Sequence, residues 1–188
     1  MEWGTEILRV FWLSWPVLVA AAVQIAVIKL KLLEGLKRPL DGGRTVRGKR
    51  LFGDHKTWRG AIVYVVVSML AVIPQAVWPQ PNLQYFDYTK TFLPYALDVG
   101  FLLGLGFVVG ELPNSFLKRQ QAIPPGERGR WWNVLLDQVD SLVGCLLFLL
   151  PLWVAPLKVW LLVLVICSGL HIAFNAVFVL LGLKTSVF

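Results

Sequence analysis

Charged residues are scarce in this sequence. Asp, Glu, Lys and Arg make up 15% of the 188 residues, whereas about 25% is usual for a soluble domain. Hydrophobic residues make up 57%, and the mean hydropathy is +0.67. This composition excludes an ordinary water-soluble domain and predicts an integral membrane protein.

Cysteine and histidine are rare as well, with two residues of each. Cys145 and Cys167 lie within apolar runs, where a thiol behaves as a small buried hydrophobic group, so no disulfide framework is expected. His55 has no second histidine or cysteine nearby, which argues against a transition-metal site. His171 and Asn175 share a helix face, where they either line a polar cavity or hydrogen-bond to neighbouring helices.

Acidic residues are few compared with basic ones, and the formal net charge is +7. Nucleic acid is not expected as a partner, because no basic groove interleaved with aromatic residues lies outside the apolar runs. The excess of Lys and Arg is instead interpreted as membrane topology and phosphate binding.

Long apolar runs dominate what is present. A helix that crosses a bilayer needs roughly 17 to 25 mostly apolar residues. Five segments are predicted to span: 10–28, 60–78, 94–112, 142–155 extended back through Asp137, and 159–183. The first is expected to be retained and not cleaved as a signal peptide. No linker or repeat divides the chain, so residues 1–188 are predicted to form one all-α, polytopic membrane helical bundle.

The basic residues are concentrated in two of the loops between these spans. Residues 34–59 carry eight Lys and Arg and residues 118–130 carry four, whereas the other two loops hold only Lys90 and Lys158. Basic residues near span ends are retained in the cytoplasm. The sequence therefore predicts an outside N-terminus, with the C-terminus and both basic loops in the cytoplasm of a cell-membrane protein.

Two polar stripes interrupt the apolar pattern near these basic loops. At helical spacing, Glu111, Ser115 and Lys118 fall on one face of the third span. A second face carries Asp137 and Asp140, followed by Ser141 and Gly144. The two stripes are expected to face each other at one membrane depth. The pairs Gly100/Gly104 and Gly106/Gly110 in the third span are assigned to close helix packing.

Carboxylates beside a membrane span are costly and by default mark a functional site. Paired carboxylates close to many Lys and Arg fit Mg²⁺ held together with substrate phosphates, which suggests phosphoryl or nucleotidyl transfer. The alternative is that Asp137 and Asp140 only pair with Arg128, Arg130 or Lys118 at the interface. The stretch "FGDHKTWRG", residues 52–60, would bring further phosphate-binding groups to the membrane surface.

These motifs resemble a known family. "KTWRG", residues 56–60, resembles the Lys-Thr-Trp-x-Gly element of the CTP-dependent phosphatidate cytidylyltransferases. "GELPNSFLKR" followed by "LLDQVDS" resembles the signature of that superfamily. The long first basic loop and the five-span length are most similar to its archaeal branch, the CDP-archaeol synthases. The Lys-Asp and His-Gly-Gly elements of the bacterial enzymes are absent between Arg119 and Asp137.

The resemblance implies roles for particular residues. Lys56, Thr57, Lys118 and Arg119 would contact the nucleotide or its pyrophosphate, and Asp54, Arg59 and Ser115 are added as binding candidates. Asp137 and Asp140 would hold Mg²⁺ together with Glu111, which stands where the family usually has Asp. The residues expected to be catalytic are Lys56, Lys118, Arg119, Asp137 and Asp140.

The expected reaction transfers CMP from CTP to a membrane lipid phosphate, giving a CDP-lipid and pyrophosphate. The lipid phosphate itself attacks, so no protein nucleophile is required. A CDP-alcohol phosphotransferase is disfavoured, because its longer aspartate-rich motif is absent. The alternative from another functional class is a non-catalytic protein that binds or transports anionic lipids.

Overall fold

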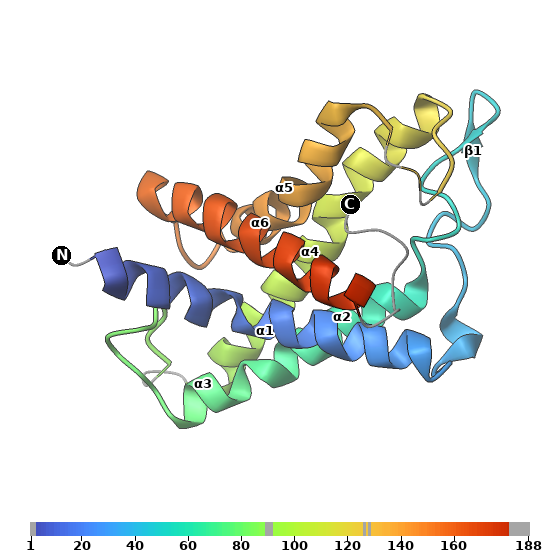
Figure 1. The fold of residues 1–188 in the computed structure, drawn as a ribbon. Coiled ribbons are helices and arrows are strands. Elements are labelled where there is room, and N and C mark those ends of the chain that lie inside the picture. Colours follow the sequence, from blue (N-terminus) through green and yellow to red (C-terminus); the bar gives the residue numbers. More distant parts are fainter. Residues whose placement is uncertain (1–2, 89–91, 126, 128, 181–188) are drawn as a thin grey trace.

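The computed structural model describes residues 3–88, 92–125, 127 and 129–180 as a bundle of helices (Figure 1). Its long helices are α1 (Trp3–Lys29), α2 (Trp58–Ala71), α4 (Phe92–Gln120), α5 (Trp131–Phe148) and α6 (Leu157–Leu180). The predicted all-α class is confirmed. Short elements complete the chain: the 3₁₀ helix η1 (Glu34–Leu36), the strands β1 (Thr45–Val46) and β2 (Lys49–Arg50), and the helix α3 (Ile73–Val77).

Three helical segments are long and apolar enough to cross a membrane: Trp3–Lys29, Trp58–Val77 and Leu93–Gln120. A shorter apolar helix covers Leu157–Ala173, so the count of five spans stays a prediction. The fourth predicted span differs in position, since α5 begins at Trp131 and ends at Phe148. Pro151 lies just beyond this end, where a proline is common because it cannot continue a helix. The end of the fifth predicted span lies outside the described residues.

Glycines let α4 approach both of its neighbours closely. A Cβ added at Gly104 would lie 2.7 Å from Val65 Cα of α2, and one added at Gly110 would lie 2.9 Å from Gly144 Cα of α5. These separations leave no room for a side chain. The predicted role of the Gly100/Gly104 and Gly106/Gly110 pairs in packing is confirmed, and α4 becomes the central helix between α2 and α5.

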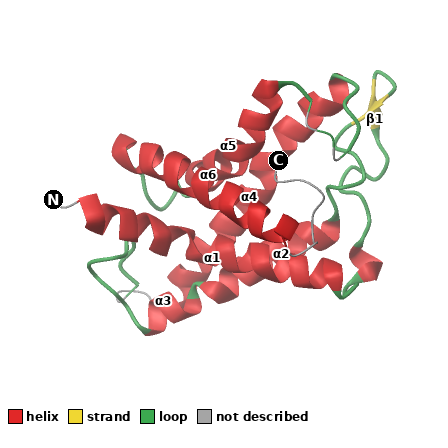
Figure 2. Ribbon diagram, viewed as in Figure 1, coloured by secondary structure: helices red, strands yellow, loops and turns green. Residues whose placement is uncertain are grey.

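The loop between α1 and α2 contains the only strands in the described part of the chain (Figure 2). Strands β1 and β2 pair antiparallel, with Thr45 opposite Arg50 and Val46 opposite Lys49. Gly48, between the strands, has a φ of +74°, a conformation that favours glycine. Lys49 Nζ donates to the carbonyl of Gln120 at the end of α4, which fixes the hairpin beside that helix.

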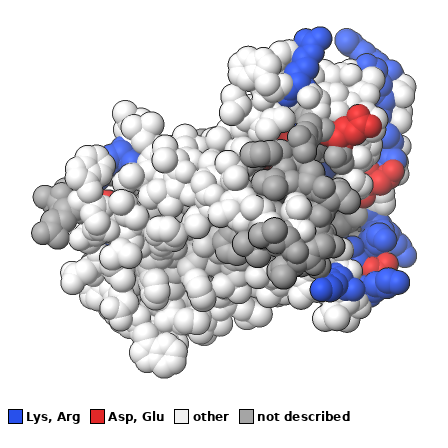
Figure 3. All heavy atoms as spheres, in the orientation of Figure 1, with Lys and Arg blue, Asp and Glu red and all other residues white. Residues whose placement is uncertain are grey.

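Charged side chains gather at one end of the molecule (Figure 3). The exposed basic residues there come from the end of α1 and the hairpin loop, and include Lys31, Lys37, Arg38, Arg44 and Arg47. At the other end of α1, buried Glu6 accepts from Lys158 at 3.2 Å and from Tyr85 at 3.0 Å. The body between the two ends presents mainly uncharged side chains, as expected of a surface that faces lipid.

Candidate active site

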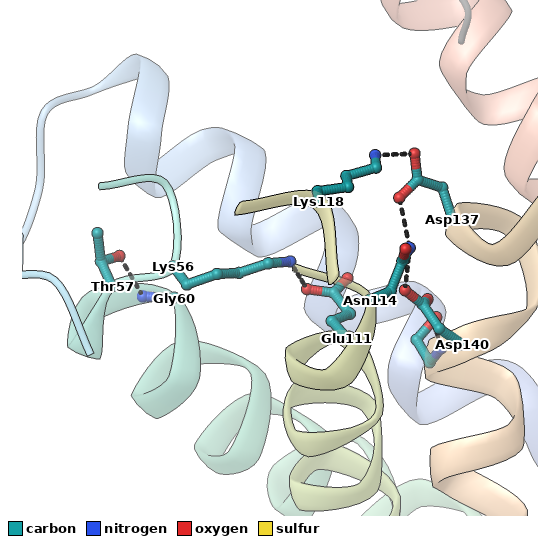
Figure 4. Close-up of polar contacts among 9 residues, drawn as sticks. Lys56, Thr57, Gly60, Glu111, Asn114, Lys118, Asp137 and Asp140 are labelled. Atoms are coloured by element: carbon teal, nitrogen blue, oxygen red, sulfur yellow. Dashed lines mark hydrogen bonds and ion pairs between the residues drawn. The ribbon is translucent and has the colours of Figure 1, made fainter. Parts of the chain in front are cut away.

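The two predicted polar stripes meet where α4 and α5 lie side by side (Figure 4). The Asn114 side-chain amide donates to Asp137 Oδ1 at 2.7 Å and to Asp140 Oδ2 at 3.0 Å. Asn114 is buried, with 4% of its surface exposed, so these bonds are made away from bulk water. The amide therefore ties both aspartates of α5 to the stripe on α4.

Two lysines complete the cluster. Lys118 Nζ pairs with Asp137 Oδ2, and Lys56 Nζ pairs with Glu111 Oε2 (Figure 4). Lys56 comes from the segment before α2, so the site draws on three parts of the chain. The sequence prediction that Lys56, Glu111, Lys118, Asp137 and Asp140 lie together is thus matched by the structure. We call these five residues and Asn114 the carboxylate cluster.

The surrounding carboxylates favour the charged form of Lys56. Burial by itself lowers the pKa of this lysine, but nearby Glu111, Asp140 and Asp137 outweigh that effect and raise the pKa above its ordinary value. Lys56 is therefore a fixed positive charge at neutral pH.

Backbone pairing determines where Lys56 sits. The Leu40 amide donates to the Lys56 carbonyl at 2.7 Å, and the Trp58 amide donates to the Arg38 carbonyl at 3.0 Å. Thr57 caps α2, since its Oγ1 accepts from the Gly60 amide at 3.2 Å. Lys56, two residues before α2, is thus held on one side by its pairing with residues 38–40 and on the other by the capped start of the helix.

Asp41 organises the loop that leads to Lys56. Its side chain is fully buried and accepts from the backbone amides of Gly43, Phe52 and Gly53, each at 3.0 Å. Arg50 Nη2 donates to it at 2.7 Å. Burial by itself raises the pKa of this carboxyl, but Arg50 and the three amides hold it well below its usual range. Asp41 is therefore a constant anion around which the loop folds.

Arg119, near the end of α4, lies buried beside this loop. The residue is 8% exposed; its Nη2 donates to the Pro124 carbonyl at 3.1 Å, while Nε and Nη1 are buried without a hydrogen-bond partner among the described residues. A Cβ added at Gly53 would lie 3.4 Å from Nη1. Buried donors without partners are rare and call for a ligand. The place suits an anionic group such as a phosphate.

Two other predicted site residues form ion pairs outside the carboxylate cluster. Asp54 is exposed and pairs with Arg50 at 2.9 Å. Arg59 is buried and pairs with Glu34 of η1, so its contact is a structural one between the loop and α2. Ser115 follows Asn114 in α4 and is half-buried.

The alternative interpretation, in which Asp137 and Asp140 only pair with basic residues at the interface, accounts for part of the cluster. Lys118 does pair with Asp137, as that alternative supposed, but the Arg130 guanidinium lies over the Trp132 ring, 4.9 Å from its centroid. Arg128 lies outside the described residues.

The donor set of the cluster fits Mg²⁺, which prefers oxygen ligands. Three carboxylates are present, and Asn114 Oδ1 is buried without a hydrogen-bond partner in the described part of the chain. Within those residues, however, no three Asp, Glu, His or Cys side chains converge closely enough to hold one ion. Lys56 and Lys118 lie against two of the carboxylates, so an ion would compete with these ammonium groups.

Asn114 is the member of the cluster that sequence reasoning missed. It lies three residues after Glu111 and four before Lys118, so helical spacing places it on the same face as both. That spacing was the available signal. The prediction relied on charged side chains at helical spacing and named the adjacent Ser115 in place of this uncharged amide.

Comparison with known proteins gives a consistent result. The family model described as CarS-like, CDP-archaeol synthase, matches residues 5–188. The CDP-archaeol synthase of Pyrococcus furiosus is 36% identical over 167 residues, covering 88% of each chain. That of Thermococcus kodakarensis is 36% identical over 80% of this chain and 78% of its own. That of Halobacterium salinarum is 36% identical over 81% of this chain and 84% of its own.

One solved structure shares the fold. It is described as an intramembrane enzyme for archaeal membrane lipids biosynthesis, with a TM-score of 0.66 and 24% sequence identity. The match covers 88% of this chain and 92% of that one.

Proposed function

This chain belongs to the CDP-archaeol synthase family, and from that premise we propose that the carboxylate cluster is where it joins CTP to a lipid phosphate. The protein is a membrane cytidylyltransferase that forms a CDP-lipid from CTP. The observation that carries the proposed site is that two lysines pair with Glu111 and Asp137 while Asn114 links Asp137 to Asp140.

The reaction needs no nucleophile from the protein. An oxygen of the lipid phosphate bonds to the α-phosphorus of CTP, the bond from that phosphorus to the β-phosphate bridging oxygen breaks, and pyrophosphate leaves. Both reactants are anions, so the protein must hold them close despite their charge repulsion. It must also align the attacking oxygen with the phosphorus–oxygen bond that breaks. Lys56 and Lys118 of the cluster, and Arg119 next to Lys118 in sequence, supply positive charge for this purpose.

Three cations are placed to hold phosphates. Lys56 pairs with Glu111 and Lys118 with Asp137, and Arg119 keeps two buried donors without partners among the described residues, beside Gly53. We assign Arg119 to the pyrophosphate part of CTP, because a guanidinium binds phosphate oxygens in a bidentate way. Lys56 and Lys118 would then balance the charge around the reacting phosphorus.

We further propose that Glu111, Asp137 and Asp140, with Asn114 Oδ1, provide the ligands of Mg²⁺. When bound, the ion supplies charge neutralisation and orientation of phosphate oxygens. Lys56 and Lys118, which pair with two of these carboxylates, would then pair with the substrate phosphates instead.

The acceptor and the sidedness also follow as proposals. The names of the relatives favour an ether-linked archaeal lipid phosphate over a diacyl lipid. The basic end of the molecule in Figure 3 would face the cytoplasm, where CTP is available.

The direct test is an assay with purified protein in detergent, labelled CTP and Mg²⁺. A di-ether isoprenoid glycerol phosphate and phosphatidic acid are supplied in parallel. We expect a labelled CDP-lipid with the ether lipid and equimolar pyrophosphate. If folded protein retains the lipid phosphate but makes no product with either acceptor, non-catalytic lipid binding is the better description.

A further inference from the structure

A cavity of about 240 Å³ lies inside the bundle, next to the carboxylate cluster. Helices α1, α2, α4, α5 and α6 all contribute to its wall. Most of the lining is apolar and includes Leu13, Val17, Leu18, Phe107, Leu146 and Val163. Five polar side chains also line it: Ser14, Gln24, Tyr64, Ser141 and His171.

The register of the helices places this cavity directly beneath the cluster. On α4, Phe107 comes one turn before Glu111, which is a rise of about 6 Å. On α5, Ser141 lines the cavity, and its backbone amide donates to the Asp140 side chain at 2.6 Å. On α2, Tyr64 stacks on Phe107 with ring centroids 4.3 Å apart, one turn beyond Gly60. On α4 and α5 the cavity thus lies within a single turn of Glu111 and Asp140, and on α2 it lies one turn beyond Gly60.

Gln24 marks the polar end of the cavity on the α1 side. Its Oε1 is buried and lacks a hydrogen-bond partner among the described residues. Its Nε2 lies 3.4 Å from the Cβ position of Gly60, in the first turn of α2. An amide left unpaired at this point indicates a polar neighbour that is added when the site is filled.

The size and walls of the cavity favour a flexible hydrocarbon chain as its occupant. An engineered apolar cavity of about 150 Å³ binds benzene and stays free of water. By proportion, 240 Å³ has room for about ten carbon atoms. The cavity is only partly enclosed, and several wall residues of α1, including Val17, Ala21 and Ile25, are half-buried.

We propose that this cavity binds the first part of one hydrocarbon chain of the lipid-phosphate acceptor. This inference rests on the proposed function. The head group lies at the Gln24 and Ser141 end, which places the phosphate against the carboxylate cluster. The volume suits a segment of one chain, so the second chain remains in the bilayer. The cavity thereby sets the depth at which the attacking phosphate is held.

Filling the cavity tests the proposal. Ala21 lines it and is half-buried, whereas its neighbour Ala22 is exposed on the same helix. We expect Ala21→Phe to raise the KM for the ether lipid phosphate by about tenfold or more, a loss of at least ~1.4 kcal/mol of binding. The KM for CTP should stay within about twofold. Ala22→Phe is the matched control and should leave both values unchanged.

A binding measurement tests whether the lipid chain occupies the cavity independently of whether the reaction takes place. An ether lipid phosphate with a diazirine early in one chain is photolysed with the wild-type protein, and the labelled peptides are identified by mass spectrometry. We expect labels on residues 13–25 of α1 and 163–171 of α6, reduced in Ala21→Phe but not in Ala22→Phe.

The two measurements distinguish the possible failures. Labels confined to lipid-facing positions, or equal lipid KM values in both variants, would overturn the cavity assignment and leave the cytidylyltransferase function standing. Labelling of the cavity without any CDP-lipid formation would support the cavity and contradict the proposed reaction.

Discussion

At the scale of single residues, the cluster is notable for how its charges are paired. Glu111 forms an ion pair with Lys56, and Asp137 forms one with Lys118. Asn114 donates hydrogen bonds to both Asp137 and Asp140. Three carboxylates against two ammonium groups leave one excess negative charge. Under the proposed function, a divalent cation would be attracted to this excess charge, and Lys56 and Lys118 would then be available to bind phosphate.

Asn114→Ala is expected to lower activity by about 10- to 100-fold, the usual cost of losing a group that orients metal or catalytic ligands. The reason is that both aspartates lose a buried donor. The measurement is initial velocity of CDP-lipid formation at saturating CTP over a range of Mg²⁺ concentrations, and the Mg²⁺ requirement should rise. Asn82→Ala, an exposed asparagine between α3 and α4, is the control. Unchanged Mg²⁺ dependence in Asn114→Ala would remove Asn114 from the site.

At the scale of helices and loops, the contact between α4 and α5 holds the cluster together. A Cβ added at Gly144 would lie 2.7 Å from Gly110 Cα. Gly110 directly precedes Glu111, and Gly144 comes one turn after Asp140. Any side chain here pushes the helices apart at the depth of the cluster.

Gly144→Ala should therefore destabilise the bundle by about 1–3 kcal/mol, the range for overpacking. It should also reduce activity more than the loss of folded protein explains. The check combines thermal unfolding in detergent with specific activity of the folded fraction. Gly169→Ala in α6 has nothing within 4 Å of the added Cβ and should behave as wild type. Equal stability of the two variants would argue against this contact geometry.

The loop before α2 depends on Asp41 in a similar way. A carboxyl with a lowered folded-state pKa stabilises the fold above its unfolded pKa of about 3.9, and that contribution is lost as pH falls through the folded value. The loop should thus resist proteolysis between residues 37 and 56 at pH 5 and above. Asp41→Asn should open it throughout that range and weaken CTP binding through Lys56. Asp98→Asn, an exposed carboxylate of α4, is the control. Loop cleavage rates equal to wild type would contradict this role.

Secondary structure was predictable where it repeats. Uncharged runs long enough to span a bilayer indicated the helices, and the Gly-x-x-x-Gly spacings in 100–110 indicated close packing. The β1–β2 hairpin was not predicted, because strands of two residues leave no periodic pattern. The role of Asp41 was missed for a related reason: three of its four partners are backbone amides, which side-chain patterns do not reveal.

At the scale of the whole molecule, the charge distribution predicts orientation. The β1–β2 hairpin and the loop that follows α3 lie at opposite ends of the bundle (Figure 1), and Arg47 of the hairpin and Asn82 of that loop are both exposed. A membrane-impermeant maleimide should label Asn82→Cys in intact cells and Arg47→Cys only after permeabilisation, since native Cys145 and Cys167 are buried. The reverse pattern would invert the topology and place the proposed CTP site outside.

The site itself was predictable in outline. Helical spacing and the family resemblance together indicated which carboxylates and lysines would meet. The spacing could not distinguish Asn114 from Ser115, since both lie near the same face. It also could not show that Arg59 pairs with Glu34, 25 residues earlier and beyond the loop, or that Asp54 pairs with Arg50, four residues earlier in a segment that is not helical.

The central claim is that the carboxylate cluster performs the transfer, and the most direct measurement compares Asp137→Asn with Asp98→Asn. Both remove one carboxylate from a long helix, but only Asp137 belongs to the cluster. With labelled CTP, Mg²⁺ and the ether lipid phosphate, we predict that Asp137→Asn loses at least about 10³-fold in CDP-lipid formation, roughly 4 kcal/mol of transition-state stabilisation. Asp98→Asn should keep wild-type rates. Full CTP-dependent activity in folded Asp137→Asn would contradict the account and move the reaction away from this cluster.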